Sequence, residues 1–539
     1  MFFHLSREQG GAFSMRMEHG CQDLLSWDLA SGERIQLLGD PVPRDPTALP
    51  QSLISAQGRI DLEKLYDLVP GHYYWFHWRG DSLECGSSFC GILPVYHSTV
   101  DGRLDISSSS GHIARTRRLT ADDEGHRLER DLFNYPLFGR TPWKGIRLLP
   151  THTRLVVRGM SATVEKGFAV EAHFGDGQRS STADMQELIS TFDTECSLLL
   201  PESGFALSFT GGFDGRTLLG AALKLGRSGF RTYGFGKPGE SDIALPEKQA
   251  RELGVPYTAI QLDERYVTEH ALRSAIAFME LSDFNGNLGR PHYHYAAERL
   301  SGECTHLVTG NFGSELFRSM HAPGAMMTPH LMSIFTGGQE WRKPALELGG
   351  HQVGNELLAH VDAYLATAAG LTSAQRFYRF VFEELFRKYF GPEITVQSHF
   401  LRNRTPFLSL RFLKALHRTT WAGVHARLFE SDKLRRMKGQ VFYAAYLKHA
   451  HPRLYRMRTN KGYAPPDVLE RWRWPLLLTS FMRRRLAGPE RVDSNSIEAF
   501  FKQHQQALLD RYGLPVEAGE DLQRLSNRVA WVAADQWGG

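Results

Sequence analysis

One short stretch organises this sequence, and it reads Phe205-Ala206-Leu207-Ser208-Phe209-Thr210-Gly211-Gly212-Phe213-Asp214-Gly215-Arg216. An apolar run ends in small residues and an aspartate, and a helical apolar pattern follows from Thr217 to Leu223. This order predicts a strand, a glycine turn and a helix, whose backbone N–H groups and N-terminus attract phosphate. Asp214 would repel a bare anion, so we expect a divalent cation between its carboxylate and the phosphate. The stretch therefore predicts a magnesium–pyrophosphate site.

The composition is that of a globular protein with more than one domain. The chain has 539 residues, 42% hydrophobic and 23% charged, so we expect two or three domains. The formal charge of +4 is small for this length and argues against nucleic acid as a partner. Five cysteines without a CxxC pair favour neither a zinc site nor a disulfide framework, and the cytoplasm is the expected location. No apolar run of about 18 residues occurs, so we expect no membrane partner.

The N-terminal third differs in pattern from the rest. Residues 1–175 alternate short β-type runs, such as 72–78 and 92–96, with glycine turns, which predicts a strand-rich α+β domain. The polar, glycine-bearing segment 175–182 suits a linker, and we expect a helix over 184–200 after it.

Residues 183–539 form the second expected domain. Its β-type runs alternate with helical segments and lie at 205–207, 231–236, 256–261 and 306–310. This alternation predicts a parallel sheet covered by helices, and thus an α/β fold. Thr210–Asp214 and Gly310–Glu315 then both fall at carboxyl ends of strands, where such sheets bind ligands. From about residue 350 the chain reads as helical, and we expect this part to pack beside the sheet.

Several segments resemble, in order along the chain, those of the asparagine synthetase family of ATP pyrophosphatases. The glycine loop is similar to the family's Ser-Gly-Gly-x-Asp-Ser-Ser loop. The other matching segments are Gly91–Tyr96, Leu137–Phe138, Lys144–Pro150, Ala250–Pro256, Gly310–Phe317, Arg404–Leu408 and Lys461–Tyr463. The resemblance implies an N-terminal-nucleophile hydrolase-like sandwich over residues 1–175. It also implies an ATP-pyrophosphatase domain with a helical C-terminal region over residues 183–539.

The resemblance further implies roles for single residues. ATP and its pyrophosphate would be bound by Thr210, Gly211, Gly212, Asp214, Gly215, Arg216 and Gly310. Asp214 and Glu315 would hold Mg²⁺, and Lys461 would stabilise the transition state of phosphoryl transfer. Asn311 and Arg402 would contact the substrate.

Each of these residues also has a plain structural interpretation, which the sequence leaves open. The glycine turn could be a tight strand–helix connection in which Asp214 caps the helix. Arg216 could bind phosphate through two hydrogen bonds or lie on the surface of the first helical turn. Glu315 could be an exposed capping residue, and Lys461 a solvated lysine.

Two departures from the family bear on activity. The family's glutaminase nucleophile is a cysteine directly after the initiator methionine, and this chain has Phe2 there, so we expect no glutamine hydrolysis. Arg402 stands where the family usually has a glutamate that handles the amine, two residues before Arg404. The amine that is activated would therefore differ, or that step would be lost.

These observations predict an ATP-dependent amide ligase that adenylates a carboxylate and couples it to an amine. The substrates would be small-molecule or peptide carboxylates and amines, as in β-lactam synthetases and lasso-peptide cyclases, which close an amide within one molecule. A non-catalytic binding or scaffold protein is the main alternative, motivated by the changes at Phe2, Gly215, Ser314 and Arg402. Sulfur or nitrogen transfer to tRNA fits less well, given the modest charge and the lack of a cysteine pair.

Overall fold

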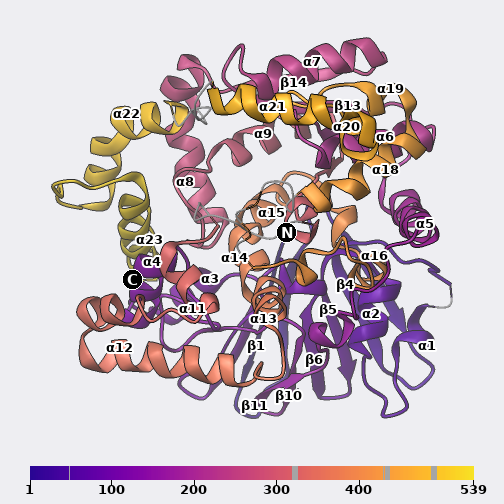
Figure 1. The fold of residues 1–539 in the computed structure, drawn as a ribbon. Helices are drawn as coiled ribbons and strands as arrows, with labels where there is room; N and C mark the ends of the chain where they lie inside the picture. The colour runs from indigo at the N-terminus through magenta and orange to yellow at the C-terminus, as the bar shows by residue number, and fades with distance from the viewer. Residues whose placement is uncertain are drawn as a thin grey trace.

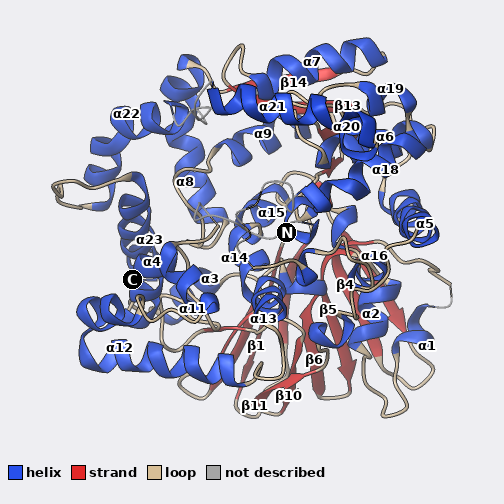
Figure 2. Ribbon diagram, in the orientation of Figure 1, coloured by secondary structure: helices blue, strands red, loops and turns tan. Residues whose placement is uncertain are grey.

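A computed structural model describes residues 1–47, 49–317, 326–428, 430, 432, 437–486 and 495–538. Within these residues the protein is a mixed α/β structure with two antiparallel sheets, one parallel sheet and many helices. Figure 1 follows the chain from the indigo strands of the first region to the yellow helices of the last. Figure 2 shows the antiparallel strands gathered in the lower part of the view and helices around the upper part.

The strands are β1 (Phe2–Glu8), β2 (Ser14–Glu18), β3 (Asp23–Asp28), β4 (Arg34–Pro41), β5 (Gly71–Arg79), β6 (Ser82–Ser87), β7 (Tyr96–Ser98), β8 (Arg103–Ser107), β9 (Arg147–Leu148), β10 (Thr153–Arg158), β11 (Ser161–Lys166), β12 (Phe205–Ser208), β13 (Arg231–Gly236), β14 (Tyr257–Gln261), β15 (His306–Val308) and β16 (Arg402–Arg404). The α-helices are α1 (Leu49–Leu53), α2 (Leu62–Leu68), α3 (Ser110–Arg117), α4 (Glu124–Phe133), α5 (Thr182–Leu199), α6 (Asp214–Lys224), α7 (Ser241–Leu253), α8 (Ala271–Leu281), α9 (His292–Ser301), α10 (Gly313–Phe317), α11 (Pro329–Thr336), α12 (Arg342–Ala366), α13 (Ser373–Phe380), α14 (Phe386–Tyr389), α15 (Gly391–Gln397), α16 (Leu410–His417), α18 (Val441–Ala450), α19 (Pro452–Arg456), α20 (Pro465–Leu469), α21 (Trp474–Leu486), α22 (Asn495–Tyr512) and α23 (Leu522–Gly538).

The first eleven strands form a sandwich of two antiparallel sheets, in the orders β2-β1-β8-β7-β9 and β11-β10-β6-β5-β4-β3. Apolar side chains from both sheets meet between them, among them Phe3, Leu38, Phe76 and Ile106. The expected strand at 72–78 is confirmed as part of β5, which is buried on both faces and therefore reads as a continuous apolar run. The expected strand at 92–96 is wrong, because only its last residue enters β7. Gly91, with a φ of 55°, turns the chain there.

The parallel sheet has the order β14-β13-β12-β15-β16, and each neighbouring pair is parallel. Four of its strands coincide with the expected runs at 205–207, 231–236, 256–261 and 306–310 within one or two residues. The fifth, β16, lies in a region that reads as helical. It joins the sheet through its register with β15, in which His306 is opposite Arg402. A strand of three residues is too short to produce a periodic signal.

The region after residue 350 is mostly helical, as expected, and α5 confirms the helix expected over 184–200. However, the last helix does not pack beside the parallel sheet. Helix α23 lies against α3 and α4 of the N-terminal region (Figure 1), where the Asn527 side chain donates to the Arg130 carbonyl at 3.1 Å. An apolar helix face shows that a partner exists but not which surface it meets.

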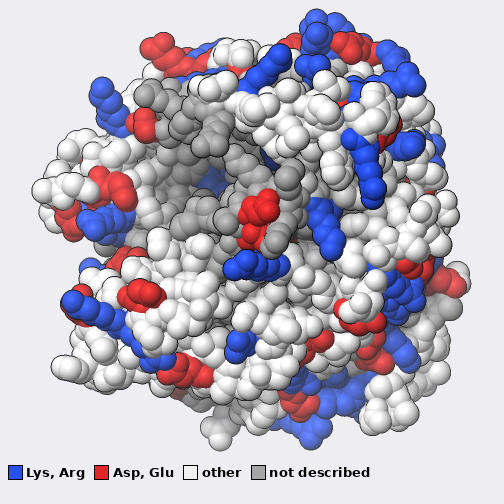
Figure 3. Space-filling view, in the orientation of Figure 1, with Lys and Arg blue, Asp and Glu red and all other residues white. Residues whose placement is uncertain are grey.

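The described helices include none with the length and hydropathy needed to cross a bilayer. On the face drawn in Figure 3, acidic and basic side chains are interspersed, in keeping with the net charge of +4.

Candidate functional site

The loops after β12 and β15 leave the parallel sheet side by side. These strands are neighbours, with Leu207 opposite Val308, so both loops emerge at the same edge. Helix α6 begins at Asp214 and helix α10 at Gly313, immediately after the two loops. The structure thus brings together the two segments that the sequence placed at carboxyl strand ends.

Asp214 lies half-buried where these segments meet. Its Oδ2 accepts a hydrogen bond from the Ser314 hydroxyl at 2.6 Å. A Cβ added at Gly310 would lie 2.7 Å from the Asp214 Cβ, and one at Gly313 would lie 2.8 Å from Asp214 Oδ1. Glycine at both positions therefore lets the second loop close over the carboxylate. Ser314 is the residue that contacts it.

Three buried oxygen atoms have no hydrogen-bond partner among the described residues: Asp214 Oδ1 and Thr309 Oγ1 of these segments, and Asn460 Oδ1 of a third loop that contacts Gly211. A buried polar atom without a partner costs about 1–3 kcal/mol, so such an atom calls for a water, an ion or a ligand. Carboxylate oxygens are ligands that Mg²⁺ prefers, and it usually takes only one or two of them beside phosphates and water. No cluster of three or more His, Cys, Asp or Glu occurs in the described ranges. Binding of Mg²⁺ through one or two carboxylates and phosphate does not require such a cluster. The residues present fit a phosphate-bound Mg²⁺.

The glycine loop is packed too closely for side chains. A Cβ at Gly215 would lie 2.1 Å from the Ser208 carbonyl oxygen. The Phe213 ring stacks on Tyr443 at 5.7 Å between centroids, which anchors the loop from behind. Thr210 Oγ1 accepts from the Gly212 N–H at 3.5 Å and holds the turn.

Lys461 lies on a third loop, which docks directly on the glycine loop. The Asn460 N–H donates to the Gly211 carbonyl at 3.0 Å, and its side-chain amide donates to Asp242 at 3.0 Å. A Cβ at Gly211 would lie 2.5 Å from the Asn460 Cβ. Lys461 itself is half-buried, and its backbone N–H donates to Thr459 Oγ1 at 3.3 Å. Lys461 is therefore adjacent in sequence to a residue that contacts the glycine loop, although some 250 positions separate the two segments.

Arg216 occupies neither of the two positions that the sequence left open. Its side chain is 0% exposed, so it is not a surface residue. Its guanidinium donates to the Gly212 and Met457 carbonyls at 3.4 and 3.5 Å, and to Gln249 Oε1 and the Arg458 carbonyl at 2.8 and 3.1 Å. Burial lowers the pKa of Arg216 to about 10. All three nitrogens are committed to protein acceptors, so Arg216 joins the glycine loop to the segment before Lys461 rather than binding phosphate.

Asn311 lies on the second loop and Glu315 in the first turn of α10, and they face different neighbours. Burial raises the pKa of Tyr389, and the nearby Glu315 carboxylate contributes to that rise. The Glu315 carbonyl accepts from the Tyr378 hydroxyl at 2.7 Å. Asn311 Nδ2 donates to Glu393 Oε1 at 2.5 Å.

Glu393 is a buried acid that sequence reasoning missed. Its side chain is fully buried and ion-paired with Arg290, and burial raises its pKa although Arg290 opposes the rise. It lies on α15, in a stretch without a motif, so no local signal could have found it. Asn460 was also missed, but its position directly before Lys461 in a matching segment is a usable signal.

The structure does not bring Arg402 to this site. Arg402 is opposite His306, at the amino end of β15, whereas the loops leave the carboxyl end. Its guanidinium donates to Asp23 Oδ1 at 2.6 Å and to the Cys21 carbonyl at 3.0 Å. The side chain therefore ties β16 to the N-terminal sandwich.

Phe2 lies in β1, and its ring packs edge-on against His112 at 4.8 Å. A cavity of about 270 Å³ lies beside it, with Tyr74, Ser109 and Asp283 in its wall. Asp283 accepts from the backbone N–H groups of Ser110 and Gly111 at 2.7 and 2.9 Å, and so caps α3 from the second region.

Comparison with known proteins adds little to this geometry. No family model matches the chain, and no curated protein matches it. Among solved structures, the chain is similar to the glutamine phosphoribosylpyrophosphate amidotransferase from B. subtilis complexed with ADP and GMP. The identity is 9%, over 60% of this chain and 77% of that chain, with a TM-score of 0.19. At this TM-score the likeness supports no further statement about fold or function.

Proposed function

We propose that this protein is an ATP-dependent, AMP-forming amide ligase of the asparagine synthetase type, without glutaminase activity. Residues 1–175 would be a glutaminase-like domain that lacks its nucleophile, and residues 183–539 the ATP-pyrophosphatase domain. The observation that carries the proposal is the Asp214 carboxylate. It lies where the chain segments after β12 and β15 meet, and its buried Oδ1 has no partner among the described residues. The substrates would be a small-molecule or peptide carboxylate and an amine.

The chemistry would proceed in two balanced steps. An oxygen of the substrate carboxylate attacks the α-phosphorus of ATP, and the bond to the β-phosphate oxygen breaks, which releases pyrophosphate. The amine nitrogen then attacks the acyl carbon, the bond from that carbon to the AMP oxygen breaks, and the nitrogen gives up a proton as AMP leaves. Backbone N–H groups of the glycine loop would bind the pyrophosphate. Asp214, with Glu315, would hold Mg²⁺, which neutralises charge on the leaving group.

The contact of the neighbouring Asn460 with Gly211 supports a role for Lys461 in the first step. A lysine ammonium placed beside the transferring phosphoryl group stabilises the negative charge that develops there. Arg216 would act indirectly, through Lys461. It donates to the carbonyls of residues 457 and 458 and so fixes the backbone that leads to Lys461.

Calorimetry of MgATP binding and ATP–pyrophosphate exchange test the proposal. We expect MgATP to bind the parent protein, and Asp214→Asn to lower exchange roughly 100- to 1000-fold, as expected for one lost electrostatic contact. Asp23→Asn is the control, because it makes the same chemical change at the residue of the sandwich that pairs with Arg402. It should leave exchange unchanged. Exchange by Asp214→Asn at the parental rate would rule out the assigned site.

A non-catalytic scaffold is the second candidate, and one observation favours it. The hydroxyl of Ser314 donates to Asp214 Oδ2, and Ser314 stands at the position where the family that the sequence resembles carries a further acid. A parent protein that binds no ATP in the presence of magnesium would support the scaffold and reject the ligase.

A further inference from the structure

A large apolar cavity lies next to the candidate site. Its volume is about 670 Å³, within the range of small-molecule binding sites. Phe317, Trp421, Val441, Trp474 and Leu477 form much of the wall that the structure describes. A volume of this size is far larger than a small acid such as aspartate requires.

Aromatic side chains connect the cavity to the glycine loop. Phe317 ends helix α10, which begins directly after the second loop. Its ring lies 4.8 Å from that of Tyr443, which in turn stacks on Phe213 of the glycine loop at 5.7 Å. Tyr463, two residues after Lys461, donates to Gln440 at 2.5 Å, between Gly439 and Val441 of the cavity wall. The cavity therefore lies behind the same elements that form the proposed ATP site.

The cavity wall continues onto an apolar surface of α21. Trp474 and Leu478 line the cavity and are nevertheless 49% and 44% exposed. Met482, one further turn along the same face, is 57% exposed. Large exposed apolar groups next to a pocket mark a surface that a ligand covers.

Few charged groups lie in the wall that the structure describes. Among the described wall residues, the Lys and Arg side chains are Arg427 and Lys438 and the one carboxylate is Glu430, so apolar groups make up most of the wall. That the ligand is an acid follows from the proposed function, in which a carboxylate is adenylated. Resting on the proposed function, we infer that the cavity holds a bulky apolar group, aromatic or long-chain aliphatic, of the carboxylic acid that the protein adenylates. The acid's carboxylate would then extend toward the glycine loop.

Binding of two plain acids, measured by calorimetry without ATP, tests this inference. Dodecanoate, below its micelle concentration, should bind at least tenfold more tightly than butanoate, because only its chain can fill the cavity. Trp474→Ala should weaken dodecanoate binding roughly tenfold. Trp472→Ala removes an equally bulky ring that is 73% exposed and outside the cavity wall, and should leave the affinity unchanged. Ala426→Trp, which fills the cavity, should abolish dodecanoate binding.

Equal affinity for the two acids in the parent, or equal losses from Trp474→Ala and Trp472→Ala, would overturn the inference. The proposed function is judged separately by exchange. Asp214→Asn should lose exchange and keep dodecanoate binding. If the parent binds dodecanoate as expected but neither binds MgATP nor exchanges pyrophosphate, the ligase is rejected and the apolar acid site is retained.

Discussion

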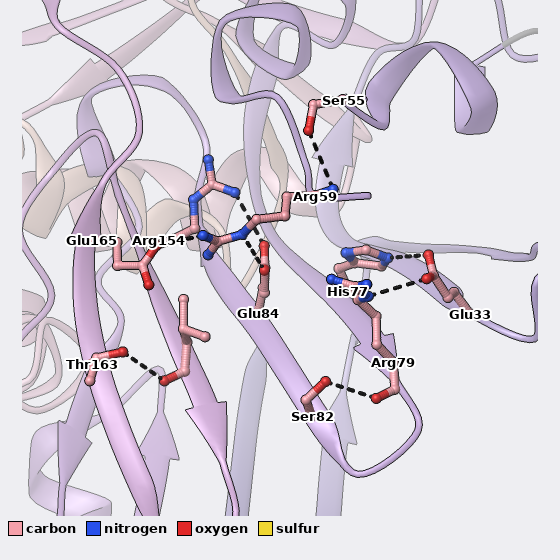
Figure 4. Close-up of polar contacts among 11 residues, drawn as sticks. Glu33, Ser55, Arg59, His77, Arg79, Ser82, Glu84, Arg154, Thr163 and Glu165 are labelled. Carbon is pink, nitrogen blue, oxygen red and sulfur yellow. Dashed lines mark hydrogen bonds and ion pairs between the residues drawn. The ribbon is translucent and has the colours of Figure 1, made fainter. Parts of the chain in front are cut away.

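Two carboxylates differ in their pairing: Glu84 in the N-terminal sandwich has cationic partners, and Asp214 at the parallel sheet has none among the described residues. Glu84 is 4% exposed, and both its oxygens are paired, with Arg59 at 2.7 Å and Arg154 at 3.2 Å (Figure 4). Glu33, directly before β4, likewise pairs with His77 and Arg79 of the same sheet. Asp214 has one neutral partner, Ser314, and no cation among the described residues.

This difference in pairing identifies Glu84 as a structural carboxylate, and it supports the proposal that Asp214 binds a ligand. Burying a carboxylate is costly, and at Glu84 two arginines offset that cost within the protein. Asp214 is half-buried, and its buried Oδ1 has no such partner among the described residues. The proposed Mg²⁺ would supply that partner. The following predictions test that contrast, beginning with the largest effect.

Removing the charge should harm stability at Glu84 and not at Asp214. Glu84→Gln leaves the buried Arg154 without its carboxylate, and we expect a loss of about 3 kcal/mol in the free energy of unfolding. Asp214→Asn removes no cation's partner and should cost less than about 1 kcal/mol. Urea unfolding without ATP measures both, and equal losses would contradict the contrast.

Stability should fall with acid because histidines are buried in the neutral form. His72, whose Nε2 lies 3.0 Å from Thr405 Oγ1, joins the sandwich to the segment after β16, and burial lowers its pKa to about 4. Between about pH 6.5 and 4 the unfolded chain binds a proton at this histidine that the folded chain does not. The free energy of unfolding therefore decreases as pH falls, by up to about 1.4 kcal/mol per pH unit for this group. His72→Gln should flatten the acid limb of a pH series of unfolding curves, and an unchanged slope would exclude this contribution.

The second loop should tolerate no side chain against Asp214. Gly310→Ala places its Cβ 2.7 Å from the Asp214 Cβ, and we expect a loss of about 1–3 kcal/mol in unfolding free energy and weaker MgATP binding. Gly370→Ala is the matched control, because no atom lies within 4 Å of its added Cβ. If both variants bind MgATP like the parent, the two loops do not form the site together.

Arg402 should have the smallest effect. Its ion pair with Asp23 is partly exposed, at 27% and 40% for the two side chains. Arg402→Ala should therefore cost less than about 1 kcal/mol and leave exchange unchanged. A large loss of exchange with unchanged unfolding free energy would show that Arg402 acts on the substrate after all.

Local sequence predicted the secondary structure around the site well. The alternation of β-type runs and helical segments predicted four strands of the parallel sheet, because such runs carry their own hydrophobic pattern. It also placed Asp214 and Gly310 at carboxyl ends of strands, and the structure shows that these two strands are neighbours. Strand β16 and the packing of α23 escaped prediction, since one is too short for a pattern and the other depends on a distant partner surface.

Within the candidate site, the sequence alone determines which groups are present: the glycines that allow close approach, the acid at 214 and the lysine at 461. Their environments depend on tertiary contacts. Arg216 is buried because Gln249 and the carbonyls of residues 457 and 458 surround it, and Asp214 retains an unpartnered oxygen because the loop after β15 supplies a hydroxyl and no cation. Long-range contacts decide burial and pairing, and these in turn set the charge and the availability of each group.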